Sequence, residues 1–350
     1  MNVSGTPSTN LTTVHFQSDY SAYDLLCAGA FILMIIISIC GNGTVFWVMT
    51  RSQLRHKPCS VLMCSLAASD IGVTVTTMPM RILEFLSIRF PRPLCIVWIA
   101  SDVLVSGSSI LTLLGIAIER YLSVVYAYRH GNLISKSSLI KAVSAIWIIS
   151  VSVAVFSIFN WTNKDYFITQ SADGKCIMSH KDFIIAVYIA VFFLPLICIS
   201  VIYITLFTIA RSKSQEAPSK STNKTFITVV MIYGAFITCW LPNAVIVMLH
   251  TFQPEVLLHL QKNPKLFRTI YYVCVMFLPP MNSMINPLIY GVYSSAFRHA
   301  TKNLISQAQF RRSAKKSALR RLARQRKECN GTINVLKVIT GRLIQKETAL

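Results

Sequence analysis

The sequence predicts an all-α integral membrane protein, a seven-transmembrane helix bundle with a short amphipathic helix after the seventh span. Two observations lead to this fold class. Hydrophobic residues make up 53% of the 350 residues and charged residues only 13%, whereas about 25% of a typical soluble domain is charged. The apolar residues also lie in long runs, and each exceeds the roughly 20 residues that cross the hydrocarbon core of a bilayer. One bundle uses most of the chain and leaves no room for a second soluble domain.

Seven apolar helices follow one another along the chain. Their expected ranges are 25–50, 59–86, 93–126, 138–159, 182–211, 223–252 and 267–291. In the amphipathic helix that follows, we expect Phe297 and Leu304 to face lipid and Arg298 and Lys302 to face water. The chain is thus divided into an N-terminal tail at 1–24, the bundle at 25–293, the amphipathic helix at 294–305 and a basic tail at 306–350.

Basic residues in the loops set the expected orientation. The loops after the first, third and fifth spans hold Arg51, Arg55, Lys57, Arg129, Lys136, Lys141, Arg211, Lys213, Lys220 and Lys224. By the positive-inside rule these loops are cytoplasmic, so the N-terminus is outside and the C-terminus inside, in a multi-pass protein of the plasma membrane. Residues 1–24 are polar and lack the pattern of a signal peptide, so the first span is expected to act as its own insertion signal. Asn2 and Asn10 begin sequons on the outer side and are predicted glycosylation sites.

The third span carries polar residues along one face. Asp102 and Arg120 are 18 residues apart, which is five helical turns or about 27 Å. They therefore share a face and lie near opposite ends of the span, with Ser109 about two turns below Asp102. An ionisable residue at the bilayer centre costs roughly 2.5–3.5 kcal/mol on insertion scales, so such residues are functional candidates.

Short motifs recur in every predicted span. They are Gly41-Asn42, Leu66-Ala67-Ala68-Ser69-Asp70, Cys95, Glu119-Arg120-Tyr121, Trp147, Pro195 with Tyr203, Phe236 with Cys239-Trp240-Leu241-Pro242, and Asn286-Pro287-Leu288-Ile289-Tyr290. Each motif is weak alone, but so many in this order are specific. Over residues 25–305 the chain resembles the rhodopsin-like (class A) family of G-protein-coupled receptors. The resemblance implies a receptor, not an enzyme, that binds an extracellular ligand and activates a heterotrimeric G protein.

The resemblance implies a set of coupling and switch residues near the cytoplasm. They are Glu119, Arg120, Tyr121, Tyr128, Tyr203 and Tyr290. Pro242 removes a backbone hydrogen bond and kinks the sixth helix, which can then pivot. Ile110, Pro195 and Phe236 match the family's packed trio, although ordinary core packing also accounts for them. Thr222 stands where many family members carry an acidic partner for the arginine, so we expect measurable basal signalling.

The resemblance also implies a sodium site in the middle of the membrane. Its residues are Asp70, Ser109, Asn282, Ser283 and Asn286, with Asp70 and Ser109 as the first metal ligands. A carboxylate with hydroxyl and amide oxygens suits a hard cation. A hydrated polar network around a protonated Asp70 is the alternative, and no other cofactor is expected.

Asp102 matches the carboxylate that pairs with a cationic amine in aminergic and opioid-like receptors. The implied ligand-binding residues are Asp102, Val103, Ser106, Tyr188, Trp240, Asn243 and Met276. The fifth helix offers Val187 and Val191 where catecholamine receptors often carry serines. Mixed charges near the pocket mouth come from Arg81, Glu84, His250 and Arg268. We therefore favour a peptide or other amine-bearing ligand over a small biogenic amine.

Two other functions remain as alternatives. A non-retinal opsin-like receptor is one, because Pro280 stands where opsins carry the retinal lysine. No lysine occurs between Arg268 and Tyr290, so no retinal Schiff base can form there. A membrane transporter or channel is the other, but it predicts repeated halves or broken helices meeting at the midplane, and the sequence has no such repeat.

The remaining features concern cysteines and the tail. Cys95 and Cys176 match the family disulfide, and both are predicted outside, where disulfides persist.

Of the net charge of +21, residues 294–350 contribute +12, from 14 basic and 2 acidic residues. Such a tail suits anionic lipid or calmodulin, or is simply solvated, and nucleic acid is not an expected partner of a protein with seven apolar spans. Thr348-Ala349-Leu350 looks like a ligand for PDZ domains, and arrestin is a further expected partner.

Overall fold

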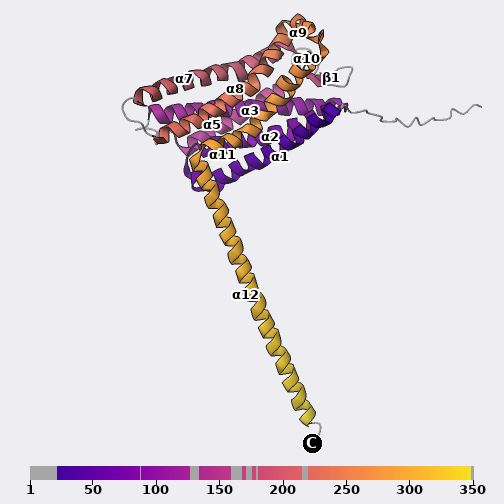
Figure 1. Ribbon diagram of the computed structural model, residues 1–350, viewed down its shortest axis with the longest axis vertical. Coiled ribbons are helices and arrows are strands. Elements are labelled where there is room, and N and C mark those ends of the chain that lie inside the picture. Colours follow the sequence, from indigo (N-terminus) through magenta and orange to yellow (C-terminus); the bar gives the residue numbers. More distant parts are fainter. Residues whose placement is uncertain are drawn as a thin grey trace, which may run out of the picture.

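The computed structural model describes residues 22–86, 88–126, 134–158, 168–170, 176–178, 180–214 and 220–347. These form a bundle of long helices lying side by side, and one further helix, α12, projects away from it (Figure 1). Among the described residues seven helical segments are long and apolar enough to cross a membrane. The predicted seven-transmembrane bundle is therefore confirmed.

Four spans are single uninterrupted helices. They are α1 (Ala22–Arg51), α2 (Ser60–Phe85), α3 (Arg92–Val125) and α5 (Lys136–Phe156). The sixth span lies in α8 (Lys220–Phe252). Short elements join them, namely η1 (Gln53–His56), β1 (Ile168–Gln170), β2 (Cys176–Met178) and α9 (Pro254–Gln261).

The fifth and seventh spans each contain a wider, π-helical segment. The fifth is built of α6 (Lys181–Val187), η2 (Tyr188–Phe193) and α7 (Leu194–Ser214), and the seventh of α10 (Pro264–Ile270), η3 (Tyr271–Phe277) and α11 (Leu278–Tyr293). Prolines explain both segments: Pro195 follows the first, and Pro279 and Pro280 follow the second. Because proline has no N–H and its ring crowds the preceding turn, the helix widens just before it.

The bundle buries polar side chains among its apolar core and exposes large apolar side chains on its outside. Ser38, Asp70 and Asn286 are fully buried, whereas Leu26 is 72% exposed and Ile148 is 66% exposed. Water would penalise such an apolar surface, but lipid does not, and buried polar groups then find partners on facing helices. This arrangement is the one expected of a bundle surrounded by hydrocarbon.

A two-stranded hairpin and a disulfide mark one end of the bundle. β1 and β2 pair antiparallel, with Thr169 opposite Ile177. Cys95 near the start of α3 forms a disulfide with Cys176 of β2, and their Cα atoms are 5.3 Å apart. The disulfide prediction is therefore confirmed, whereas the hairpin was not predicted. We call this the disulfide end, and the opposite end, where α11 meets α12, the α12 end.

The helix after the seventh span differs from its prediction in length and in contacts. α12 runs from Ser295 to Glu347, so it begins as expected but does not end near residue 305. Residues 288–350 contain no proline, and the basic segment is rich in Ala, Leu, Arg and Lys, which favour helix. Phe297 is buried against the bundle, with its ring 6.2 Å from that of Tyr290, and Leu304 also packs on the core. The expectation that both face lipid is wrong.

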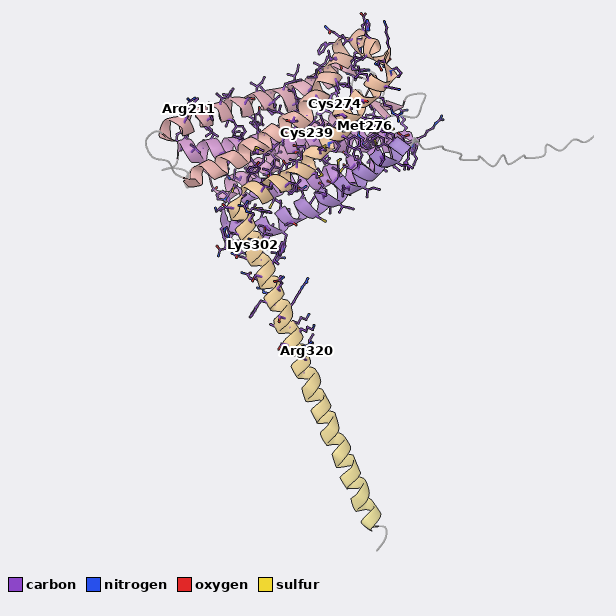
Figure 2. All side chains as sticks on the ribbon, viewed as in Figure 1. Arg211, Cys239, Cys274, Met276, Lys302 and Arg320 are labelled. Carbon is purple, nitrogen blue, oxygen red and sulfur yellow. A yellow bond between two sulfur atoms is a disulfide. The ribbon has the colours of Figure 1, made fainter. Side chains whose placement is uncertain are left out.

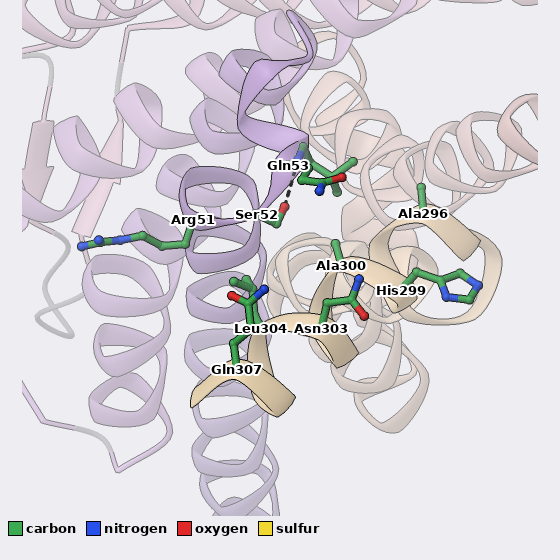
Figure 3. Close-up of a pocket in the computed structure, with 10 residues that line it drawn as sticks. Arg51, Ser52, Gln53, Ala296, His299, Ala300, Asn303, Leu304 and Gln307 are labelled. Carbon is green, nitrogen blue, oxygen red and sulfur yellow. Dashed lines mark hydrogen bonds between the residues drawn. The ribbon is translucent and has the colours of Figure 1, made fainter. Parts of the chain in front are cut away.

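A cleft of about 240 Å³ lies between η1 and the first turns of α12. Ser52 accepts a hydrogen bond from the backbone N–H of Leu54 at 3.0 Å and so starts the short helix on one wall. On the walls, the Arg51 and His299 side chains point away from one another (Figure 3). The two ionisable groups therefore do not converge on a common point.

Candidate ligand site and switch residues

A small cavity of about 40 Å³ lies inside the disulfide half of the bundle. It is lined from α2, α3, α8, η3 and α11 by Val73, Thr77, Arg81, Asp102, Ser106, Trp240, Asn243, Val275, Pro279 and Pro280. Four of the residues expected to bind ligand, Asp102, Ser106, Trp240 and Asn243, thus share one cavity. Helices two, three, six and seven in chain order contribute to it.

The carboxylate of Asp102 is held from the neighbouring helix α2. Thr77 Oγ1 donates a hydrogen bond of 2.7 Å to Asp102 Oδ1. One turn further along α2, Arg81 Nη1 pairs with Glu84 Oε2 at 2.9 Å and lies 3.3 Å from the sulfur of Met276. The cavity therefore contains an anionic group and a cationic group, each with its own partner.

The other three expected ligand residues lie around this cavity and do not line it. Tyr188 accepts a hydrogen bond from Asn243 Nδ2 at 3.4 Å, which links η2 to α8. Met276 is buried inside the bundle (Figure 2) and contacts Arg81. Val103 is half-buried on α3 and is not one of the lining residues.

Sequence reasoning placed Arg81 only near the pocket mouth and did not name Thr77. A signal for Arg81 existed, because a basic residue inside a span is costly and so marks a site. Thr77 precedes Arg81 by one helical turn and shares its face, but a threonine in a span carries no comparable signal.

The residues of the expected sodium site are buried on α2, α3 and α11. Asn286 Nδ2 donates to Asp70 Oδ2 at 2.9 Å, and Asn42 Nδ2 donates to the carbonyl of Ser283 at 2.8 Å. Four buried oxygens have no hydrogen-bond partner among the described residues: Asp70 Oδ1, Ser109 Oγ, Asn282 Oδ1 and Asn286 Oδ1. A buried carboxylate together with unpaired hydroxyl and amide oxygens fits the donor preference of a hard cation. Clusters of three or more His, Cys, Asp or Glu side chains do not occur in the part of the chain that the structure describes.

The switch residues gather toward the α12 end. Arg120 Nε lies 3.1 Å from Glu119 Oε2, and the Glu119 side chain is only 5% exposed. Tyr203 and Tyr290 are buried, and both are within electrostatic reach of Arg120. Tyr121 packs at the edge of the core. The expected residue Tyr128 lies outside the described residues, as does the side chain of Thr222.

Cys59, just before α2, is a neighbour of this group that sequence reasoning did not name. Burial raises the pKa of the Cys59 thiol, and the nearby Arg120 guanidinium partly opposes that rise in pKa. The thiol therefore stays uncharged at neutral pH and adds no anion beside the arginine.

Aromatic rings connect the cavity to the middle of the bundle. Trp240 lines the cavity, and its ring lies 6.4 Å from that of Phe236 one helical turn below. Phe236 in turn lies 6.0 Å from Phe192, and both are buried together with Ile110. The trio expected at Ile110, Pro195 and Phe236 is thus buried in the core of the bundle.

Comparison with known proteins places the chain. A family model described as "7 transmembrane receptor (rhodopsin family)" matches residues 41–290. The chain is 24% identical over 311 residues to the histamine H2 receptor of Cavia porcellus, covering 84% of this chain and 83% of that protein. It is 25% identical over 336 residues to the alpha-1A adrenergic receptor of Rattus norvegicus, covering 82% of this chain and 69% of that protein. The family match spans more than half of the chain. This chain therefore belongs to the rhodopsin family of seven-transmembrane receptors, which are multi-pass proteins of the plasma membrane and not enzymes.

Proposed function

We propose that this receptor binds an amine-bearing ligand at Asp102 and then activates a heterotrimeric G protein through its α12 end. The cavity that reaches Asp102 is the observation that carries the proposal. A half-buried carboxylate that lines a cavity is a natural partner for a ligand ammonium group. Arg120 lies five turns further along the same helix, so one helix joins the two ends.

The narrow cavity favours a small ligand over a large one. Its volume of about 40 Å³ is far below the roughly 300–1,000 Å³ of sites for drug-sized molecules, so the lining side chains must move apart even for a small amine. Two relatives carry the names of receptors for histamine and adrenergic ligands, which also supports a small amine. The sequence-based preference for a peptide stays a prediction, and peptides belong in the same assay.

The proposed transmission runs from Trp240 through Phe236 to the α12 end. Pro242 interrupts the hydrogen bonding of α8 just beside Trp240. A ligand that displaces Trp240 would therefore act at the point where α8 bends most easily. Outward movement of the α12 end of that helix would expose Arg120 for the G protein.

Orientation, sodium and tail partners complete the proposal. We place the disulfide end outside the cell and α12 in the cytoplasm, in agreement with the loop charges. Sodium, held by Asp70 and its neighbouring oxygens, would supply a positive charge that balances the buried carboxylate. Arg311, Lys315 and Arg320 are exposed on α12, which supports binding to anionic lipid. Arrestin stays a prediction, as does a PDZ partner for residues 348–350, which lie outside the described residues.

The test is ligand-stimulated nucleotide exchange in membranes that contain the receptor and a G protein. Histamine, noradrenaline, tyramine and a set of basic peptides serve as probes. At least one amine should stimulate exchange on the wild type and lose its effect on Asp102→Asn. Asp24→Asn is the matched control, because Asp24 pairs with Arg268 at 2.9 Å outside the cavity. A response that survives in Asp102→Asn contradicts the proposal, as does probe flux into vesicles without exchange.

A further inference from the structure

Arg81 is a cation built into the wall of the ligand cavity. Its side chain is 18% exposed, and its Nη1 alone forms the ion pair with Glu84. Its guanidinium carbon stands 5.1 Å from the centre of the Trp98 ring, so the two side chains stack. A guanidinium presents five N–H groups in a planar fork that matches two carboxylate oxygens. The contact with Glu84 uses only one of its three nitrogens.

Two N–H donors in this stack are buried and meet no acceptor among the described residues. They are Arg81 Nε and Trp98 Nε1. Both groups can only donate, so another donor such as an ammonium cannot satisfy them. A buried donor without an acceptor is unfavourable and needs an explanation. The pair therefore calls for an acceptor that the described protein does not supply.

Arg81 and Trp98 lie one helical turn from the two residues at the carboxylate; Arg81 lines the cavity, and Trp98 packs behind it. Thr77 and Arg81 are four residues apart on α2, and Trp98 and Asp102 are four residues apart on α3. Residues with this spacing share a helix face, one turn or about 6 Å apart. The directions of both helices place Arg81 and Trp98 nearer the disulfide end, with Asp102 and Thr77 below them. The donors of Arg81 and Trp98 thus lie one turn nearer the disulfide end than the acceptor, the carboxylate of Asp102.

We propose that Arg81 and Trp98 form a carboxylate subsite, so that the ligand is a small zwitterion with both an ammonium and a carboxylate group. The ammonium binds Asp102, and the carboxylate accepts hydrogen bonds from Arg81 and Trp98. This inference rests on the proposed function, because it takes Asp102 as the partner of the amine. It narrows the ligand from amines in general to amino acids and their analogues.

Glu84 already pairs with Arg81, so it competes with a ligand carboxylate for the guanidinium group. A ligand carboxylate must share the guanidinium with Glu84 or displace it. Removing the charge of Glu84 should therefore strengthen the binding of zwitterions. If the Arg81–Glu84 pair only stabilised the fold, removing either partner would lower the stability of the receptor and leave its preference between zwitterions and amines unchanged.

The experiment uses pairs of probes that differ by one carboxylate. The pairs are histidine and histamine, tyrosine and tyramine, and ω-amino acids of two to five methylenes with the corresponding alkylamines. Binding is measured by the thermal shift of the purified receptor, and activation by nucleotide exchange. In the wild type we expect at least one zwitterion to bind about tenfold or more tightly than its amine partner.

Four variants give the expected pattern. Arg81→Gln should lower the affinity for that zwitterion about 10- to 100-fold and change the affinity for its amine partner less than about threefold. Arg81→Lys should keep part of the preference, since it keeps the charge but loses the fork. Trp98→Phe keeps an aromatic ring and removes the N–H donor, so it should lower the affinity for the zwitterion about threefold to tenfold. Glu84→Gln should raise the affinity for the zwitterion about threefold or more.

Each contrary result has a distinct meaning. The carboxylate subsite is overturned if amines bind through Asp102 at least as tightly as their zwitterions, or if Arg81→Gln weakens both probes equally. Either result leaves the proposed function standing. If Asp102→Asn changes neither probe class, or if no probe of either class shifts the melting temperature, the proposed function fails and this inference fails with it.

Discussion

Thr77 and Asp102 are joined by a hydrogen bond of 2.7 Å that connects α2 to α3 at the wall of the cavity. The threonine hydroxyl donates, so it occupies one lone pair of Oδ1 and leaves the remaining carboxylate lone pairs for a ligand. The bond fixes the side-chain rotamer of Asp102 before a ligand arrives. Such preorganisation reduces the entropy lost on binding.

Asp102→Asn should cripple activation by any cationic agonist while surface expression persists. Loss of one member of a partly desolvated charge pair typically costs about 2–5 kcal/mol. Thr77→Val should cost much less, about 1 kcal/mol or roughly fivefold in potency, because the carboxylate keeps its charge. Agonist titrations of nucleotide exchange measure both variants. Unchanged potency of a cationic agonist on Asp102→Asn would contradict the assignment of Asp102 as the partner of the ligand amine.

Sodium should lower agonist affinity, and Asp70→Asn should remove that effect. An ion that favours the inactive state is, by linkage, disfavoured by an agonist to the same extent. Competition binding in sodium chloride and in N-methylglucamine chloride measures the coupling. Asp24→Asn is again the control, since it removes a carboxylate distant from the cluster and should keep the sodium effect. Equal agonist affinities in the two salts would argue against a cation at Asp70.

Much of the fold was predictable because hydropathy and helix geometry act locally. Asp102 and Arg120 were placed on one face of the third span from their spacing alone, and the structure keeps both on α3. The end of α12 was not predictable in the same way. A basic amphipathic segment can be helical or solvated with little difference in free energy, so composition does not decide where the helix ends.

The cavity was predicted less completely than the bundle. Asp102, Ser106, Trp240 and Asn243 share it, but Thr77 enters through a contact between two helices. Such a contact depends on the rotation of α2 about its axis, which the hydrophobic pattern of an almost entirely apolar span fixes only loosely. Phe297 shows the same limit, since its face of α12 packs on Tyr290 and not on lipid.

Glu119→Gln should raise basal nucleotide exchange. The buried Glu119 carboxylate lies 3.1 Å from Arg120 Nε, and this ion pair holds the arginine against α3. Its loss removes a bias of about 1–3 kcal/mol at best, so the increase should be modest. Thr222→Glu should act in the opposite direction by offering Arg120 a second carboxylate. Exchange without ligand, at matched surface expression, measures both, and identical basal activity in all three receptors would show that packing alone holds the closed state.

Gly41→Ala should destabilise the bundle, and Gly43→Ala should not. A Cβ at Gly41 would stand 2.8 Å from both Cβ and Cγ of Pro287, whereas one at Gly43 would meet nothing within 4 Å. Carbon atoms prefer separations of about 3.5–4.0 Å, so α1 must move away from α11, at a cost of about 1–3 kcal/mol. Both substitutions gain the same helix propensity within α1, so the difference between them reports on packing alone. The melting temperature of the purified receptor should fall for Gly41→Ala and stay level or rise for Gly43→Ala. Equal melting temperatures would mean that α1 and α11 approach each other less closely than this contact requires.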